Sequence, residues 1–292
     1  RNKGRIFIGV LIIFLISALG IRQAETVYGA EREKTERAFV GVPVLMYHHL
    51  TQADGDAKGV TITQDRFRAD MKYLERNDYT PLLPTDLSAI AAGEQAMPQR
   101  PIIITFDDGY ESNYRLGFPV LKETGMKATI FVITEAMNTQ RQGQIPKLTW
   151  VQMKEMYDSG FVDIQTHSHD LHNSENQGEF KRFDINGIQR TSTENQTQYD
   201  SRVGSDFENS IHLIEKNVGN DVMAISYPFG VFEPWSLRLL EELGIEFGFI
   251  IGNTTGDFFN KPYEITRYNV NMNKGLWQLL EKIEGMNQEP YA

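Results

Sequence analysis

Short apolar runs alternate along this chain with longer stretches in which apolar residues recur at every third or fourth position. The clearest run covers residues 102–106, which contain three consecutive isoleucines and no charge. Strands are also expected at residues 42–47, 127–133, 161–166, 222–227, 247–251 and 265–270, which are rich in apolar residues. Continuous apolar runs of this length predict strands of a parallel sheet that is covered on both faces.

The stretches between these runs predict helices. Thr63, a residue type favoured as an N-cap, is followed at helical spacing by Phe67, Met71 and Leu74. Further helices are expected through residues 119–121, 150–157, 205–218 and 233–243, and glycines at positions 125, 160, 219 and 244 are expected to end them.

Two of these helices are predicted to begin with capping boxes, one formed by Thr149 with Gln152 and the other by Ser205 with Glu208. Residues 173–204 are rich in Asn, Gln, Ser and Thr and lack clear periodicity, which predicts a long surface insertion. Strands and helices otherwise alternate about seven times, which predicts the α/β class with a parallel sheet, closed or nearly closed into a barrel.

The amino terminus has the pattern of an export signal. Residues 1–5 are basic, residues 6–21 are apolar, and Arg22 follows them. Residues 1–30 are therefore interpreted as a signal peptide or a retained membrane anchor, two alternatives that the pattern leaves open. Residues 31–41 are read as a polar linker and residues 42–292 as one main domain. We expect this domain outside the cytoplasm, either secreted or anchored to the outer face of the cell membrane.

Charge and cysteine content exclude several classes of function. The formal net charge of −10 argues against nucleic-acid binding, which uses basic surfaces. The chain has no cysteine, which excludes disulfides, thiolate metal sites and cysteine nucleophiles. Any metal ion must therefore be bound by His, Asp or Glu.

Candidate chemistry follows two of the predicted strands. Asp107 and Asp108 come directly after the run 102–106, and His167, His169 and His172 come directly after the run 161–166. Barrel enzymes build their active sites at the carboxyl ends of the strands. One Asp with two His makes a three-ligand set with open coordination positions, as a catalytic metal requires. The other Asp is then free to act as a general base.

The residues 105–109, Thr-Phe-Asp-Asp-Gly, resemble the first motif of the NodB-homology polysaccharide deacetylases, carbohydrate esterase family four. Residues 166–172, Thr-His-Ser-His-Asp-Leu-His, resemble its histidine motif, and residues 226–230, Ser-Tyr-Pro-Phe-Gly, resemble its third motif. The spacing of the two outer histidines is most similar to the intercellular-adhesin type of poly-β-1,6-N-acetylglucosamine N-deacetylase. The resemblance extends over residues 42–285 and implies a distorted parallel (β/α)7-type barrel with residues 42–292 as the catalytic domain.

The resemblance implies a role for each matching residue. Asp108, His167 and His172 would bind a divalent metal ion, with zinc as the first choice and iron, cobalt or nickel as alternatives. Asp107 would be the general base. Tyr227 and its neighbour Pro228 would lie on the substrate side of the site. His169 is expected to support a ligand or contact the substrate.

The chain departs from the family pattern at two points. The family usually takes its acid histidine from a late motif, but this chain has no histidine after His212. We expect His48, at the end of the first strand, to be the general acid, with His49 as the alternative. The family's third motif also supplies an arginine that tethers the catalytic Asp. No arginine directly precedes Tyr227, and Arg267 is the expected substitute, next to the substrate site.

The predicted function is therefore metal-dependent N-deacetylation of an N-acetylglucosamine polymer, with the biofilm-type β-1,6-linked polymer favoured. Peptidoglycan N-deacetylation and O-acetyl xylan esterase activity on the same fold are the alternatives, and a non-catalytic glycan-binding protein is a third. The expected partners are the acetylated polysaccharide and, through the amino terminus, a membrane or cell-wall surface. No nucleic acid is expected, and the chain is expected to be a monomer.

Overall fold

The computed structural model describes residues 41–137, 144–172, 187–273, 276–277 and 279–281. The predicted signal or anchor (1–30) and almost all of the predicted linker lie outside these residues. Among the described residues, no helix is both long enough and apolar enough to cross a membrane.

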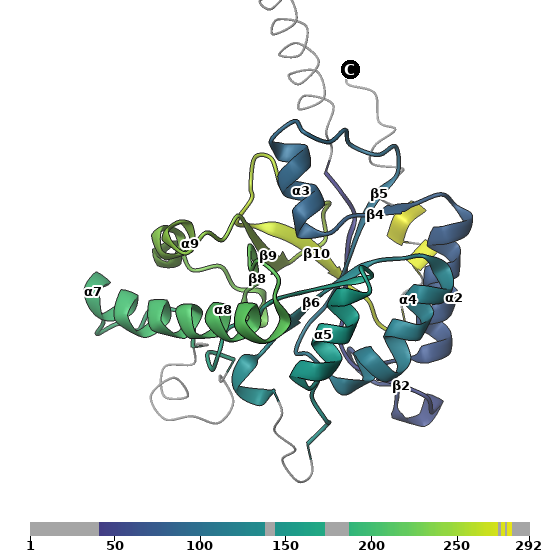
Figure 1. Cartoon of the computed structure of the whole chain (residues 1–292), viewed down its shortest axis with the longest axis horizontal. Coiled ribbons are helices and arrows are strands. Elements are labelled where there is room, and N and C mark those ends of the chain that lie inside the picture. Colours follow the sequence, from purple (N-terminus) through teal and green to yellow (C-terminus); the bar gives the residue numbers. More distant parts are fainter. Residues whose placement is uncertain (1–40, 138–143, 173–186, 274–275, 278, 282–292) are drawn as a thin grey trace, which may run out of the picture. The chain divides into compact units, whose positions relative to one another are not determined.

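A ring of parallel strands forms the centre of the domain (Figure 1). Its members, in spatial order, are β1 (Val44–Tyr47), β10 (Ile265–Asn269), β9 (Phe247–Ile251), β8 (Ala224–Ser226), β7 (Val162–Thr166), β6 (Ala128–Val132) and β5 (Pro101–Phe106). The ring closes because β5 also pairs with β1, with Val44 opposite Ile103 and Tyr47 opposite Phe106. The predicted (β/α)7-type barrel is therefore confirmed.

The barrel is distorted around β5. The short strand β4 (Thr80–Pro81) pairs with the beginning of β5, whereas β6 pairs only with its last two residues, Thr105 and Phe106. A separate pair, β2 (Leu50–Thr51) with β3 (Ile62–Thr63), lies outside the ring. The apolar runs of the sequence predicted none of these three short strands.

The helices follow the strands on the outside of the barrel. They are α2 (Gln64–Arg76), α3 (Pro84–Ala91), α4 (Phe118–Thr124), α5 (Trp150–Asp158), α7 (Gln196–Tyr199), α8 (Ser205–Val218) and α9 (Leu237–Glu242). Thr63 caps α2 as predicted, since its side chain accepts a hydrogen bond from the Arg66 amide. The predicted capping box of Thr149 and Gln152 begins α5.

The second predicted capping box is wrong. Ser205 does not begin a helix, because α7, a wider turn at Asp200–Gly204 and α8 run on continuously (Figure 1). The capping box is formed instead by Asn195 and Gln198. Part of the predicted insertion 173–204 is thus helical, with Tyr199 and Val203 fully buried. Residues 173–186 lie outside the described residues.

Alternation along the strands divides the core into two layers. On β5, Ile102, Ile104 and Phe106 face the helices and belong to the large hydrophobic cluster, whereas Ile103 and Thr105 are buried outside that cluster. Successive strand residues point to opposite faces. Asp107 continues the inner row, so its carboxylate lies at the end of the barrel interior.

Candidate active site

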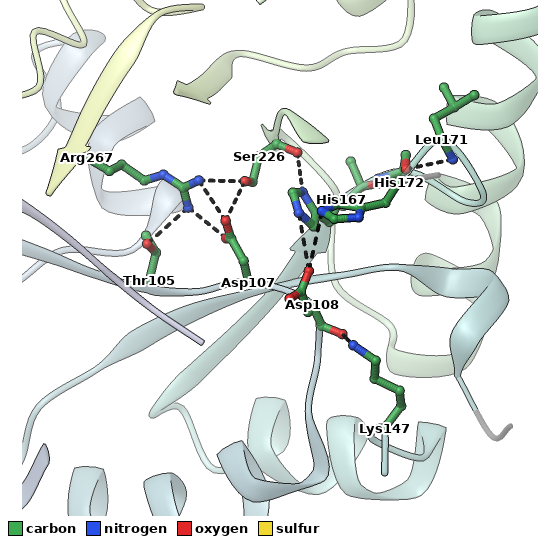
Figure 2. Close-up of polar contacts among 11 residues, drawn as sticks. Thr105, Asp107, Asp108, Lys147, His167, Leu171, His172, Ser226 and Arg267 are labelled. Atoms are coloured by element: carbon green, nitrogen blue, oxygen red, sulfur yellow. Dashed lines mark hydrogen bonds and ion pairs between the residues drawn. The ribbon is translucent and has the colours of Figure 1, made fainter. Parts of the chain in front are cut away.

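Two adjacent carboxylates at the end of β5 point in different directions. Asp108 has a φ of 72° and Gly109 a φ of 61°. A left-handed conformation is uncommon for a residue other than glycine and turns the chain sharply. A Cβ on Gly109 would lie 2.9 Å from Val132 Cγ1, so a larger residue would clash there. This turn leaves Asp107 facing the barrel interior and directs Asp108 toward the strand ends (Figure 2).

Asp107 is held in a buried ion pair with Arg267 from β10. The two guanidinium nitrogens lie 2.7 and 2.8 Å from the two carboxylate oxygens. Ser226 Oγ donates to Asp107 at 3.1 Å and accepts from Arg267 at 2.8 Å. Burial alone would raise the pKa of Asp107, but the charge and hydrogen bonds of Arg267 hold that pKa well below its usual range. Asp107 is therefore ionised at any physiological pH.

Asp108 faces two histidines from the segment after β7. Asp108 Oδ1 lies 3.6 Å from His167 Nε2 and 3.7 Å from His172 Nε2 (Figure 2). Two ligand atoms about 2.1 Å from one ion in a tetrahedral arrangement would be about 3.4 Å apart. The three side chains form a cluster in which one ligand atom from each lies within 4.8 Å of the others. This spacing suits a shared cation.

The hydrogen bond of His167 places its proton on Nδ1 and leaves Nε2 as an acceptor in the cluster. His167 Nδ1 lies 2.6 Å from the carbonyl oxygen of Ser226, which can only accept, so Nδ1 carries the proton and Nε2 presents a lone pair to Asp108. Burial lowers the pKa of His167 to about 4, which keeps its ring neutral at pH 7. Among the described residues, Asp108 Oδ1 has no hydrogen-bond donor although it is buried. An unpaired buried carboxylate oxygen beside the unprotonated Nε2 of His167 is costly, and a cation would remove that cost.

Two residues that the motifs did not indicate hold Asp108 from the other side. Lys147 Nζ donates to the Asp108 carbonyl oxygen at 2.8 Å and lies 3.7 Å from the centre of the Tyr110 ring. The Tyr110 ring lies on this side of Asp108, and burial and the Asp108 charge together raise the pKa of Tyr110. Lys147 is far from Asp108 in sequence, and no local pattern marks it.

The segment 167–172 is fixed by neighbouring elements. Ser168 has a φ of 76°, which breaks the alternation after β7. His169 consequently turns away from His167, and its Nδ1 lies 2.8 Å from Thr134 Oγ1. The two oxygens of Asp206 on α8 accept the amides of His169 and Asp170, each at 2.8 Å. Because Ser205 was predicted to begin the helix, the bonds from Asp206 to the segment 167–172 were not predicted.

His48 and His49 have different surroundings. His48 lies close enough to Asp107 and Asp108 for its charge to lower the pKa of each, and its buried Nδ1 has no partner among the described residues. His49 Nδ1 lies 2.8 Å from Ser112 Oγ, with its ring beside Tyr110. Of the two histidines, His48 is the one whose position suits proton transfer beside Asp107 and Asp108.

The expected substrate contacts of Tyr227 and Arg267 do not fit their burial. Both side chains are fully buried, and Arg267 is occupied by Asp107. The Tyr227 amide donates to the Phe249 carbonyl at 3.1 Å, and its ring packs against Phe232. Pro228 is also buried and begins the turn Pro228–Gly230. The third motif therefore reaches the surface through its exposed Phe229, whose ring centre lies 4.2 Å from that of His172.

Residues 94–248 match the family model described as polysaccharide deacetylase. The chain belongs to that family, as the sequence motifs predicted. It is 32% identical over 215 residues to a putative polysaccharide deacetylase, YxkH, of Bacillus subtilis, a match that covers 74% of this chain and 66% of that relative. It is 26% identical over 300 residues to the poly-beta-1,6-N-acetyl-D-glucosamine N-deacetylase of Staphylococcus epidermidis, covering 97% of this chain and 98% of that one.

Solved structures share the fold. IcaB from Ammonifex degensii superposes with a TM-score of 0.68 at 22% identity, covering 83% of this chain and 97% of that chain. The deacetylase PplD of Streptococcus pyogenes gives a TM-score of 0.68 at 21% identity, covering 84% and 98%. At this identity the likeness establishes the barrel, and the assignment of roles depends on the residues themselves.

Proposed function

We propose that this chain is a metal-dependent N-deacetylase of an N-acetylglucosamine polymer, with the β-1,6-linked polymer as the favoured substrate. The observation that carries the proposal is the cluster of Asp108, His167 and His172, in which one ligand atom of each side chain lies within 4.8 Å of the others and the buried Asp108 Oδ1 has no hydrogen-bond donor among the described residues. The matching length and the printed activity of the Staphylococcus epidermidis relative support the choice of polymer.

Asp108, His167 and His172 would hold the ion, for which zinc is our first choice. When bound, such an ion lowers the pKa of a water molecule and polarises the acetyl carbonyl. Asp107 would accept a proton from the attacking water, with Arg267 and Ser226 holding the carboxylate in place. His48 would donate a proton to the departing nitrogen, so that cleavage of the amide yields acetate and a free amine. We also propose that the domain acts outside the cytoplasm.

The decisive experiment measures metal content together with acetate release from a panel of polymers. We expect release from β-1,6-linked poly-N-acetylglucosamine, its loss after chelation, and its recovery on adding zinc. Acetylated xylan and peptidoglycan serve as comparison substrates. Release from acetylated xylan alone would replace the amide substrate with an ester, and activity unaffected by chelation would refute metal dependence.

His48→Ala is expected to lower kcat on the order of 10²–10⁴-fold, as for a lost acid–base group, without reducing metal content. The reason is that His48 lies beside Asp107 and Asp108 but outside the proposed ligand set. The measurement is steady-state acetate release with metal analysis of the same sample. Unchanged turnover would show that the leaving nitrogen obtains its proton elsewhere.

Asp206→Asn is expected to weaken metal binding by roughly 10–100-fold. The asparagine side chain has one acceptor oxygen and one NH2 group. One of the two backbone N–H groups that now donate to Asp206 would therefore face the NH2 group of the asparagine. The segment that carries His172 would then be less firmly held. Metal affinity is measured by competition with a chelator, and Glu208→Gln, an exposed change on the same helix, is the matched control. Equal affinities in both variants would contradict this role.

A further inference from the structure

His49 lies next to the proposed general acid but does not share its environment. The chain alternates past the end of β1, so His48 faces the two carboxylates while His49 turns toward Ser112 and Tyr110. No step of the proposed reaction uses His49. Its ring instead lines a cavity of about 610 Å³.

This cavity is separate from the metal cluster but adjoins it. Its walls come from residues 49–56, residues 111–116 and the pair Ile145 and Pro146, and none of Asp107, Asp108, His167 or His172 lines it. Glu111 donates its amide to the Pro146 carbonyl at 2.8 Å, and the next residue, Lys147, bonds to the Asp108 carbonyl. The volume falls within the range of roughly 300–1,000 Å³ that is typical of small-ligand sites.

Ser112 joins the His49 ring to the neighbouring backbone. Ser112 Oγ accepts the Leu50 amide at 3.0 Å and lies 2.8 Å from His49 Nδ1. In the tautomer in which the Ser112 hydroxyl donates to His49 Nδ1, Nε2 carries the hydrogen. Burial and the charge of Lys147 lower the pKa of His49, so the ring is neutral at pH 7. In that tautomer His49 offers an N–H donor to the cavity.

The remaining wall combines charged and apolar groups. Glu111 and Arg115 form an ion pair at 2.7 Å, and the hydrogen bond from Arg115 lowers the pKa of Glu111, which keeps it an ionised acceptor. Leu50, Ala53 and Ile145 supply apolar surface. A pyranose ring has the same combination, with hydroxyl groups around its edge and an apolar face.

We propose that this cavity is a subsite for the sugar unit next to the one being deacetylated, and that His49 Nε2–H donates a hydrogen bond to that sugar. The inference depends on the proposed function, because only a polymeric substrate continues beyond the reacting unit. His49 is thus a specificity residue for chain length and takes no part in proton transfer.

The test compares a long substrate with one too small to reach the cavity. The value of kcat/KM is measured on a β-1,6-linked N-acetylglucosamine pentamer and on an aryl acetate ester. In His49→Ala the ratio of pentamer to ester activity is expected to fall about tenfold, the effect of one lost hydrogen bond. His212→Ala, a histidine on α8 away from both sites, is the matched control and should keep the wild-type ratio.

Two further variants separate binding from loss of local structure. His49→Gln retains an N–H donor near the position of Nε2 and should recover part of the ratio. Ala53→Trp places a bulky side chain in the cavity from an exposed residue with extended backbone, and should lower the ratio with Ser112 and His49 intact.

The possible outcomes distinguish the subsite from the proposed function. A wild-type protein that hydrolyses the ester but no N-acetylglucosamine oligomer would overturn both proposals. Wild-type ratios in His49→Ala and Ala53→Trp, with normal acetate release from the pentamer, would overturn the subsite alone.

Discussion

Replacement of His172 by alanine is expected to remove tightly bound metal and to lower kcat/KM on the order of 10³-fold or more, because the metal's contribution to catalysis amounts to several kcal/mol. His172 is half-buried, and its Nε2 faces Asp108 Oδ1. Without it, only Asp108 and His167 remain of the proposed ligand set. Metal stoichiometry is measured by elemental analysis, and folding is checked by circular dichroism.

His169→Ala is the matched control for this prediction. His169 lies in the same segment, but its ring bonds to Thr134 and is not part of the cluster that faces Asp108. We expect this variant to retain stoichiometric metal. A His172→Ala protein with one tightly bound ion per chain would refute the assignment of His172 as a ligand, whatever its activity.

The barrel was predictable because its strands are short segments rich in apolar residues and its helices have regular apolar spacing. The placement of Asp107, Asp108, His167 and His172 at one edge follows from the same pattern, since the carboxyl ends of parallel strands meet there. These are local signals, and each is contained in fewer than fifteen consecutive residues.

The start of the helix that contains α7 and α8 was predicted wrongly, because tertiary packing decides between two identical capping patterns. Ser205 with Glu208 and Asn195 with Gln198 have the same capping pattern, and only burial of Tyr199 and Val203 selects the earlier start. Asp206 is then left inside the helix, free to accept the amides of another segment. Nothing in the local sequence distinguishes these two cases.

The contacts of Asp107 could be described in full only from the folded structure. Arg267 was expected to tether Asp107 and to lie next to the substrate site; its ion pair with Asp107 is present, and its side chain is fully buried. Ser226 lies in the third motif, and its bonds to both Asp107 and Arg267 depend on the ring being closed. Ser226 comes from β8, Arg267 comes from β10, and Asp107 is the residue directly after β5.

Asp107→Asn is expected to lower kcat on the order of 10²–10⁴-fold while the metal is retained, because an amide cannot accept the proton of the attacking water. The same change leaves the buried charge of Arg267 without its counter-ion. Loss of one member of a buried pair costs about 3 kcal/mol of unfolding free energy or more. A fall in activity could then reflect either lost chemistry or lost folding, and the single variant does not distinguish them.

The double variant Asp107→Asn with Arg267→Met separates the two effects. Methionine removes the unpaired charge and fills much of the volume beside Phe131 and Phe249, whose rings flank the guanidinium. Buried ion pairs replaced by apolar residues commonly retain or gain stability. We therefore expect chemical denaturation to show recovered stability and acetate release to remain as low as in Asp107→Asn. Recovery of turnover together with stability would mean that Asp107 serves the fold and that the proton is accepted by another group.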